Sequence, residues 1–416
     1  MTGSRLQHLD GIRGIAAFAV FVCHFIQVFV PHVYYLDAAQ GHGLWEDEFA
    51  TSPFNIIVNG NFAVCLFFVL SGFVLSHRFL DTGDLDGLRR LAIKRYLRLA
   101  LPVLAAVLLA WAILAAGSYS YGAVQPVTRS GMKDVYDAFV PFWAAVEEGV
   151  VGVFFRGEWN LNPVLWTMRI ELYGSFLVFG LLALFGRTGY RWLVYGVAIA
   201  IFYESYYLAF LLGIALADLQ LRADHRDAPL PVTLGAVMLG LYLGSYPYYG
   251  AEQGIWSVLP AVGTAHKPVL YHILGAAVLI QAANRFTGAR LLLARPLFRF
   301  LGRISYGLYL IHFPLVCSVS AGLALVLLAH LDYGAAVALS FALSAPVVVV
   351  TAALFTTLVD QRAMRVADTF AALVMGAWRR PGLTLAPTFG GRPLEPGTLA
   401  STPSISLTSN TGECRG

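Results

Sequence analysis

Long apolar runs recur along the whole chain and restrict it to one class of fold. Ten of them approach the roughly 20 residues that a helix needs to cross a bilayer. They fall at 11–30, 56–77, 97–116, 164–185, 190–203, 205–220, 230–247, 269–284, 304–331 and 333–359. The composition, 58% hydrophobic and 12% charged, is far from that of a soluble globular protein. We therefore predict an all-α, polytopic integral membrane protein with about ten transmembrane helices, a multi-pass protein in a lipid bilayer.

The positive charges of the connecting segments predict an orientation. If the N-terminus is cytoplasmic, the cytoplasmic segments carry 22 Lys and Arg residues and the outward segments carry 4. Loops rich in Lys and Arg stay in the cytoplasm. We expect both termini to be cytoplasmic and the transmembrane domain to span 1–379. The segment 380–416 is rich in Pro, Gly, Ser and Thr, which predicts a disordered cytoplasmic tail.

Two further sequence features limit what the protein can bind. Three of the four cysteines lie in apolar runs and the fourth in the tail, with no paired Cys/His spacing and no HExxH motif. We therefore predict no disulfide framework, no metal site and no nucleic-acid partner. The outward segment 117–163 is rich in aromatic residues. It fits a lid of interfacial or re-entrant helices and, equally well, a loop anchored by an aromatic belt.

The first span contains two ionisable side chains, Arg13 and His24. Eleven positions of helix place them on nearly one face and about 16 Å apart along the axis. Snorkelling toward the headgroups explains Arg13 alone. A hydrogen bond between helices would explain His24, but an imidazole titrates near physiological pH and suits a general base. Because ionisable groups inside a membrane usually mark a site, we favour the functional interpretation.

The fourth span, LWTMRIELYGSF, contains Arg169 and Glu171. Two residues apart on a helix, they face different directions, and each needs its own partner on another helix or in a cavity. Near the C-terminus, FRFLGRISYGLYLIHFPL places Tyr306, Tyr309 and His312 in one helix. For His312, a functional role and a hydrogen bond between helices are equally good interpretations.

A basic segment, LRRLAIKRYLRLALP, precedes the third span and contains Lys94, Arg95 and Arg98. Arg98 shares a helix face with both of the others, at i,i+3 and i,i+4. Topological anchoring explains such a cluster. The alternative is a cradle for a phosphorylated cytosolic ligand, because guanidinium groups match phosphate oxygens. In the second span, Ser71 and the glycine after it interrupt an apolar run, which is typical of close helix packing.

Five blocks of the sequence, taken in order, resemble the signature of the membrane-bound acyltransferase-3 family. They are LDGIRGIAAFAVFVCH, FAVCLFFVLSGFVLSHRF, the RYLR box, NPVLWTMRIELYGSFLVF and FLGRISYGLYLIHFPL, and they span residues 9–315. The resemblance implies an enzyme that transfers an acyl group from cytosolic acyl-CoA to a hydroxyl or amine, and we favour acetyl-CoA as the donor. Its acceptors are carbohydrates, lipids and natural products.

The resemblance also implies roles for particular residues. The arginine and histidine of the family's first helix fall on Arg13 and His24, its Arg-x-x-Arg box on Arg95 and Arg98, and its acid on Glu171. At Arg169 this sequence departs from the family, which usually has a small or apolar residue there. We expect His24, Arg13 and Glu171 to be catalytic. We expect the donor to be bound by Arg95, Arg98, Lys94, Ser71 and Tyr306.

A second class of function fits the same charges. In a proton-coupled transporter, Arg13, His24, Glu171 and His312 would form a relay without covalent chemistry. Labelling of an acceptor from acyl-CoA separates the two hypotheses. The sequence leaves a homo-oligomer open, because lipid-facing and partner-facing apolar helix surfaces look alike.

Overall fold

The computed structural model describes residues 7–132, 136, 139–223, 226–251, 254–260 and 267–378. The described residues up to 375 form one compact unit. Every regular element in the described part is helical, which confirms the all-α prediction. The predicted tail, 380–416, and its cysteine lie outside the described residues.

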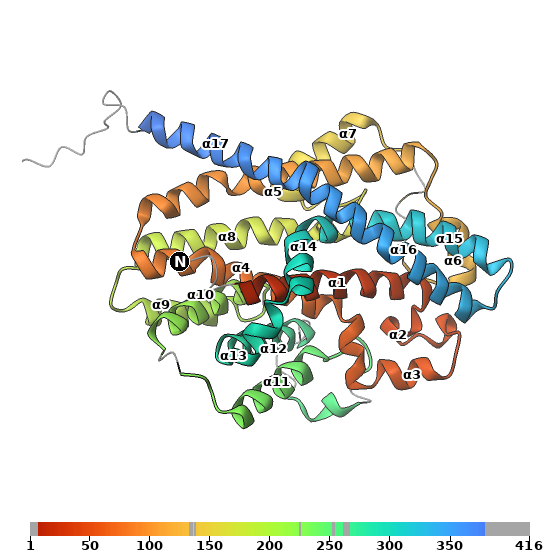
Figure 1. Ribbon diagram of the computed structural model, residues 1–416, viewed down its shortest axis with the longest axis horizontal. Coiled ribbons are helices and arrows are strands. Elements are labelled where there is room, and N and C mark those ends of the chain that lie inside the picture. Colours follow the sequence, from red (N-terminus) through yellow and green to blue (C-terminus); the bar gives the residue numbers. More distant parts are fainter. Residues whose placement is uncertain are drawn as a thin grey trace, which may run out of the picture. The chain divides into compact units, whose positions relative to one another are not determined.

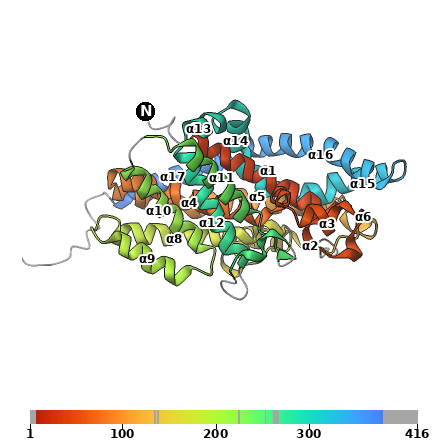
Figure 2. The same ribbon diagram turned by 90° about the horizontal axis from the view of Figure 1, so that it is seen from below.

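The longer helices carry most of the apolar sequence. They are α1 (Gln7–Phe29), α4 (Gly60–Thr82), α5 (Leu85–Ala115), α8 (Trp166–Phe185), α9 (Arg191–Phe202), α10 (Tyr207–Arg222), α11 (Leu230–Gly244), α12 (Lys267–Asn284), α14 (Pro296–Leu315), α16 (Tyr333–Phe355) and α17 (Gln361–Trp378). Figure 1 and Figure 2 show α1, α4, α5 and α8 running side by side in one bundle.

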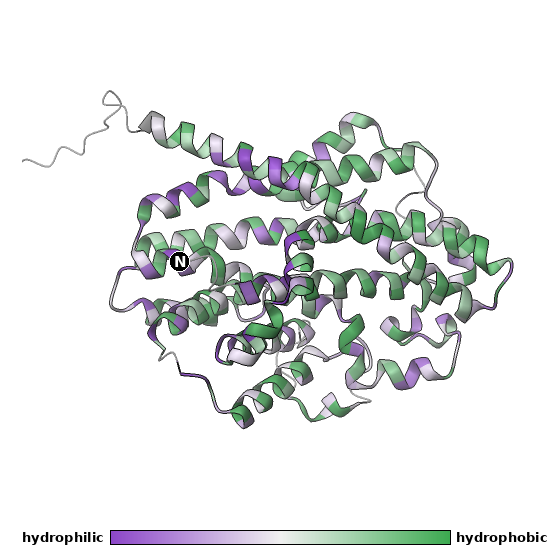
Figure 3. Cartoon of the chain, viewed as in Figure 1, coloured by the Kyte–Doolittle hydropathy of each residue, from purple (hydrophilic) through white to green (hydrophobic). Residues whose placement is uncertain are grey.

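Shorter helices connect and extend these. They are α2 (His32–Tyr35), η1 (Ala38–Gln40), α3 (Trp45–Ala50), η2 (Pro53–Val58), α6 (Tyr121–Thr128), α7 (Phe142–Glu147), η3 (Glu148–Arg156), η4 (Pro163–Leu165), η6 (Ile255–Val258), α13 (Thr287–Leu293), η7 (Val316–Ser320), α15 (Ala321–Leu328) and η8 (Thr356–Asp360). Figure 3 shows hydrophobic residues dominating the long helices, with hydrophilic residues gathered on the first half of α5 and on α17.

Local sequence determines where the long helices begin and end. The side chains of Asn59, Asp84 and Asp332 accept hydrogen bonds from backbone N–H groups in the first turns of α4, α5 and α16. Such caps satisfy donors that the helix itself leaves unpaired. Gly83 ends α4 with φ +67°, a left-handed conformation that glycine adopts without strain. Two apolar helices, α4 and α5, are thereby separated by a sharp turn.

Fewer of the described helices are long and apolar enough to span a membrane than the ten that the sequence predicts. Six helical stretches in the described residues are long and apolar enough, and α12 with α13, bent by 100°, makes a seventh if counted as one span. The apolar helices α9 and α11 are shorter. At about 1.5 Å per residue, the 12 residues of α9 reach only about 18 Å. The count of about ten spans and the orientation of the termini therefore stay predictions.

Small residues allow the central helices to approach closely. A Cβ atom at Gly302 of α14 would lie 2.2 Å from the carbonyl oxygen of Asp10 in α1. At Gly72 of α4 it would lie 2.2 Å from the carbonyl oxygen of Phe210 in α10. Close backbone contact of this kind is typical of helix packing in membranes. It brings α14 against α1 and α10 against α4, and α1 also packs on α4.

The segment after α5 folds back along that helix. The indole of Trp111 donates to the carbonyl of Val140 (2.9 Å), and the hydroxyl of Tyr96 donates to that of Val150 (2.6 Å). Because fifteen residues of helix separate Trp111 from Tyr96, α7 and η3 lie along about 22 Å of α5. Part of 117–163 is therefore helical and packed on α5, and both interpretations of this segment stay predictions.

Candidate active site

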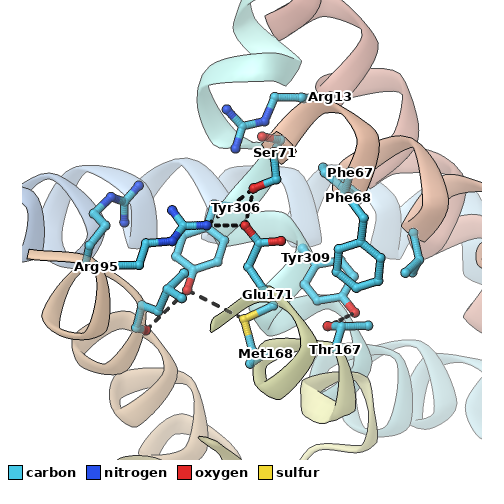
Figure 4. Close-up of a pocket in the computed structure, with 14 residues that line it drawn as sticks. Arg13, Phe67, Phe68, Ser71, Arg95, Thr167, Met168, Glu171, Tyr306 and Tyr309 are labelled. Atoms are coloured by element: carbon cyan, nitrogen blue, oxygen red, sulfur yellow. Dashed lines mark hydrogen bonds and ion pairs between the residues drawn. The ribbon is translucent and has the colours of Figure 1, made fainter. Parts of the chain in front are cut away.

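A cavity of about 90 Å³ lies between α1, α4, α5, α8 and α14. Its lining combines aliphatic and aromatic side chains with several charged groups. The polar and charged members are Arg13, Ser71, Arg95, Arg98, Thr167, Glu171, Ser305, Tyr306 and Tyr309. Figure 4 shows Arg13, Arg95 and Glu171 entering from three different helices.

Arg95 is the most extensively bonded group of this cavity. Its guanidinium pairs with the carboxylate of Glu171 and donates to the hydroxyl of Ser175 (2.7 Å) and to that of Ser71 (3.3 Å). Ser71 in turn donates to Glu171. The side chains of Arg95 and Glu171 are each 14% exposed. Glu171 therefore holds Arg95 and Ser71 in place, and its bonds go to these residues and not to His24.

The other two basic residues of the cluster are paired with acids near the C-terminus. Arg98 pairs with Asp360 of η8, and its guanidinium lies 5.2 Å above the ring of Tyr306. Lys94 contacts Asp368 of α17 at 2.9 Å and does not line the cavity. The C-terminal helices thus neutralise part of the basic cluster.

Arg13 differs from the other cations of the cavity. No described residue forms an ion pair or hydrogen bond with its guanidinium. The lining contains three guanidinium groups, of which Arg95 pairs with Glu171 and Arg98 with Asp360, so within the described structure the charge of Arg13 stays uncompensated. Such an excess of positive charge attracts an anion. Arg13 is the group best able to bind one without first losing a partner. No group of three potential metal ligands converges within the described residues.

His24 lies outside this lining and contacts a second histidine. Its Nδ1 lies 2.9 Å from the carbonyl oxygen of Val20 and 3.1 Å from Nε2 of His312. Nδ1 of His312 lies 3.0 Å from the carbonyl oxygen of Leu308. Since a carbonyl only accepts, both Nδ1 atoms carry the proton, and Nε2 of His312 accepts from His24. In its neutral form His24 therefore has its lone pair on Nε2, which no described residue hydrogen-bonds.

Tyr309 connects the cavity to the histidine pair. It lines the cavity, lies one helical turn before His312, and its ring centroid is 6.0 Å from that of His312. Its hydroxyl lies 2.7 Å from that of Thr167 and 2.8 Å from the carbonyl of Val164. These bonds fix the start of α8 against α14. His24 thus contacts a residue, His312, that lies one helical turn from the cavity lining.

The structure brings together most of the residues that the sequence singles out. Arg13, Ser71, Arg95, Arg98, Glu171 and Tyr306 share one cavity. Lys94 lies next to it, and His24 pairs with His312. Arg169 is exposed, with its guanidinium 5.8 Å from the ring centroid of Tyr173, and so does not face the cavity. Sequence reasoning missed Ser175, Asp360 and Asp368. The one signal in the sequence that could have indicated Asp360 is its position as an acid directly after an apolar run.

Known proteins similar to this chain are acyltransferases. A family model described as an acyltransferase domain matches residues 6–358. The acyltransferase R4 of Phoma sp. (strain ATCC 20986 / MF5453) is 23% identical, over 77% of this chain and 84% of its own length. The acyltransferase MdmB of Streptomyces mycarofaciens is 27% identical, over 75% and 79%.

A further relative is the O-acetyltransferase PaAT-1 of Phomopsis amygdali, 23% identical over 74% of this chain and 71% of its own. No solved structure matches the chain. The family match covers most of the residues that the structure describes, the cavity and the histidine pair included. The chain therefore belongs to the acyltransferase-3 family and is an acyltransferase.

Proposed function

We propose that this enzyme moves an acetyl group from cytosolic acetyl-CoA to a hydroxyl group of a carbohydrate, lipid or natural product, with His24 as general base. One observation carries the proposal. The contacts of His24 with Val20 and His312 leave its neutral lone pair on Nε2, and His312 lies one helical turn beyond Tyr309 of the cationic cavity. The relative PaAT-1 is named an O-acetyltransferase, which supports acetyl transfer to oxygen.

The cationic cavity would hold the donor. Arg13 has no partner in the described part of the chain and would bind an anionic group of the coenzyme first. Arg95 and Arg98 would contribute once a phosphate competes with Glu171 and Asp360 for their guanidinium groups. The positions of Arg13 and His24 on α1 are about 16 Å apart along the axis. That separation is comparable to the length of a pantetheine arm, which would then bring the thioester to the histidine pair.

The proposed chemistry is direct transfer. Nε2 of His24 accepts the proton of the acceptor hydroxyl as its oxygen attacks the thioester carbonyl. The resulting tetrahedral intermediate collapses and breaks the carbon–sulfur bond. The departing sulfur takes the proton from His24 and leaves as the thiol of coenzyme A. His312 accepts a hydrogen bond from Nδ1–H of His24, and this bond stabilises the imidazolium that forms between the two proton transfers.

The deciding experiment measures transfer from radiolabelled acetyl-CoA in membranes that contain the wild type or a variant. For His24→Ala we expect a loss of about 10²- to 10⁴-fold in product formation, the usual contribution of a general base. His330→Asn replaces an exposed histidine and serves as the control. Full activity of folded His24→Ala would refute the proposed base.

A second variant tests the histidine pair. His312→Gln removes the imidazole that accepts from Nδ1 of His24. We expect kcat to fall about 10- to 100-fold, as is typical when the partner that orients a functional histidine is lost. The KM for acetyl-CoA should change little, because His312 does not line the donor cavity. An unchanged kcat, with a KM for acetyl-CoA that rises about 10- to 100-fold, would contradict a positioning role.

A further inference from the structure

A second and larger cavity, of about 370 Å³, lies on the other side of α1. From Arg13 to Val22 the helix turns through nine positions, about 900°, so Val22 faces away from Arg13 and His24. The walls are apolar side chains of α1 and α16 together with residues of the segment around α3. The lining residues used below are Val22, Phe25, Ile26, His42, Trp45, Glu46, Tyr333, Ala338 and Phe341.

Two polar atoms of the residues that line this cavity are acceptors that lack a donor. Glu46 is 1% exposed, and its Oε1 accepts from the backbone N–H of His42 (3.0 Å). Its other oxygen, Oε2, has no hydrogen-bond partner in the described structure. Nε2 of His42 lies 3.2 Å from the carbonyl of Val127 and donates to it, so Nδ1 carries a lone pair, and this atom also lacks a partner. A buried carboxylate oxygen without a hydrogen-bond donor is costly, and a cation that donates hydrogen bonds would satisfy both its charge and its lone pairs.

Aromatic rings line the same cavity. The ring of His42 stacks on that of Tyr333, with centroids 4.0 Å apart and an angle of 2° between the planes. Phe25, Trp45 and Phe341 complete the aromatic part of the lining. Aromatic faces stabilise organic ammonium groups, and the carboxylate adds the charge pair. The lining therefore fits a ligand head that carries an ammonium group with N–H donors.

A second charge near the cavity fits a zwitterionic head. Arg129 is exposed, and its Nη1 donates to the carbonyl of Gly41 (2.6 Å), the residue before His42. A guanidinium group has further N–H donors beyond the one used here. A negative group of the ligand near this arginine would be matched while the ammonium group occupies the interior.

The apolar walls continue along α1 beyond the cavity. Ile15 precedes Val22 by seven residues and Ile26 follows it by four, so the three side chains lie along one helix face. Ile15 is 42% exposed, although it lies in the middle of an apolar helix. An acyl chain leaving the cavity would cover this stripe of side chains.

We propose that the cavity around Glu46 binds a phospholipid with a primary ammonium head group, whose acyl chain lies along the Ile15–Val22–Ile26 face of α1. The ammonium group donates to Glu46 and His42, and the phosphate lies near Arg129. The site is separate from the proposed donor cavity and does not depend on the acyl-transfer mechanism.

The test uses the purified full chain, stripped of lipid in detergent and incubated with phosphatidylethanolamine, phosphatidylcholine or phosphatidylglycerol. Lipid that stays bound after gel filtration is counted per chain by mass spectrometry. We expect about one phosphatidylethanolamine per chain and at least tenfold less of the other two, since only the first offers ammonium N–H donors. Equal retention of phosphatidylglycerol would overturn the proposal.

Two variants and a control complete the design. Glu46→Gln keeps the acceptor for His42 and removes the charge, so retention should fall about tenfold or more. Glu48→Gln removes an exposed carboxylate of the same helix and should change nothing. Ala338→Trp fills the cavity from an exposed position and should also abolish retention. Unchanged retention in folded Glu46→Gln, or displacement of the lipid by an equimolar amount of free ethanolamine, would overturn a lipid site.

Discussion

At the scale of single residues, breaking the ion pair of Arg95 with Glu171 should strongly lower stability. Both side chains are almost fully removed from water, and Arg95 also bonds Ser175 and Ser71. Removing one partner of a buried pair leaves an uncompensated charge. We expect Glu171→Leu and Arg95→Met each to destabilise the protein by about 3–5 kcal/mol.

The double variant distinguishes a buried pair from two independent residues. Arg95→Met with Glu171→Leu removes both charges, so its unfolding temperature in detergent should lie above that of either single variant. The exposed pair of Arg89 with Asp86 is the control, because Arg89→Met should cost at most about 1 kcal/mol. A double variant less stable than both single ones would show that the two charges do not compensate each other.

Sequence reasoning at this scale found residues but not their partners. Glu171 and Arg169, two positions apart, were expected to face different directions, and the structure places one in the cavity and the other on the surface. The partner of Glu171 could not be predicted, because 76 residues separate it from Arg95. The same holds for His24 and His312, which are 288 residues apart. Such pairs depend on how helices pack, and an apolar helix gives few signals of that.

At the scale of elements, the crossing of α1 and α14 depends on glycine. Because a Cβ atom at Gly302 would lie 2.2 Å from the carbonyl oxygen of Asp10, even alanine there forces the two helices apart. We expect Gly302→Ala to lower stability by about 1–3 kcal/mol and to reduce transfer, since the helices carry Arg13 and Tyr306. Gly180→Ala in α8 is the control, because nothing lies within 4 Å of its Cβ position. Unfolding temperatures that match for the two variants would contradict a tight crossing.

The short helices α2 and α3 are linked by a pair that depends on pH. Nε2 of His32 lies 2.7 Å from a carboxylate oxygen of Asp47. Burial alone would lower the pKa of His32, but the hydrogen bond and the charge of Asp47 outweigh it and raise this pKa above 6.5. A group whose pKa is raised in the folded state stabilises that state below its unfolded pKa. This contribution is lost as the pH rises through the folded value.

The stability of the variant Asp47→Asn should reveal this contribution. We expect its unfolding temperature to fall below that of the wild type at pH values under 6.5. The difference should shrink as the pH rises through the raised pKa of His32. The measurement is a series of thermal melts between pH 5.5 and pH 9. A difference that stays constant across the series would exclude the His32–Asp47 pair as its cause.

At the scale of the whole molecule, hydropathy identifies the fold class and leaves the number of crossings open. The long runs of the sequence became long helices, because an apolar segment in lipid must satisfy its backbone internally. The runs at 190–203 and 205–220 became α9 and α10, joined by a few residues. Such short helices reach only part of the way across a bilayer of about 30 Å. Whether α9 and α10 each cross the membrane depends on how they pack against other helices and on the local bilayer thickness, and not on apolar length alone.

The side of the membrane on which each turn lies can be measured with single cysteines. Thr188 lies in the turn between α8 and α9, and Leu331 in the turn between α15 and α16. Both views place these two turns at opposite ends of the bundle (Figures 1 and 2). The distribution of Lys and Arg predicts that Thr188 is cytoplasmic and Leu331 is not.

Native cysteines leave little background for this labelling. Cys23, Cys65 and Cys317 are buried. Both labelling variants also carry Cys414→Ser, which removes the fourth cysteine. In sealed right-side-out vesicles, a membrane-impermeant thiol reagent should label Leu331→Cys and spare Thr188→Cys until detergent is added. The proposed donor enters the cavity of Arg13 and Arg95 from the cytoplasm. Labelling of Thr188→Cys instead of Leu331→Cys would place the entrance of that cavity on the side of the membrane without acyl-CoA. It would therefore contradict both the predicted orientation and the assignment of the donor cavity.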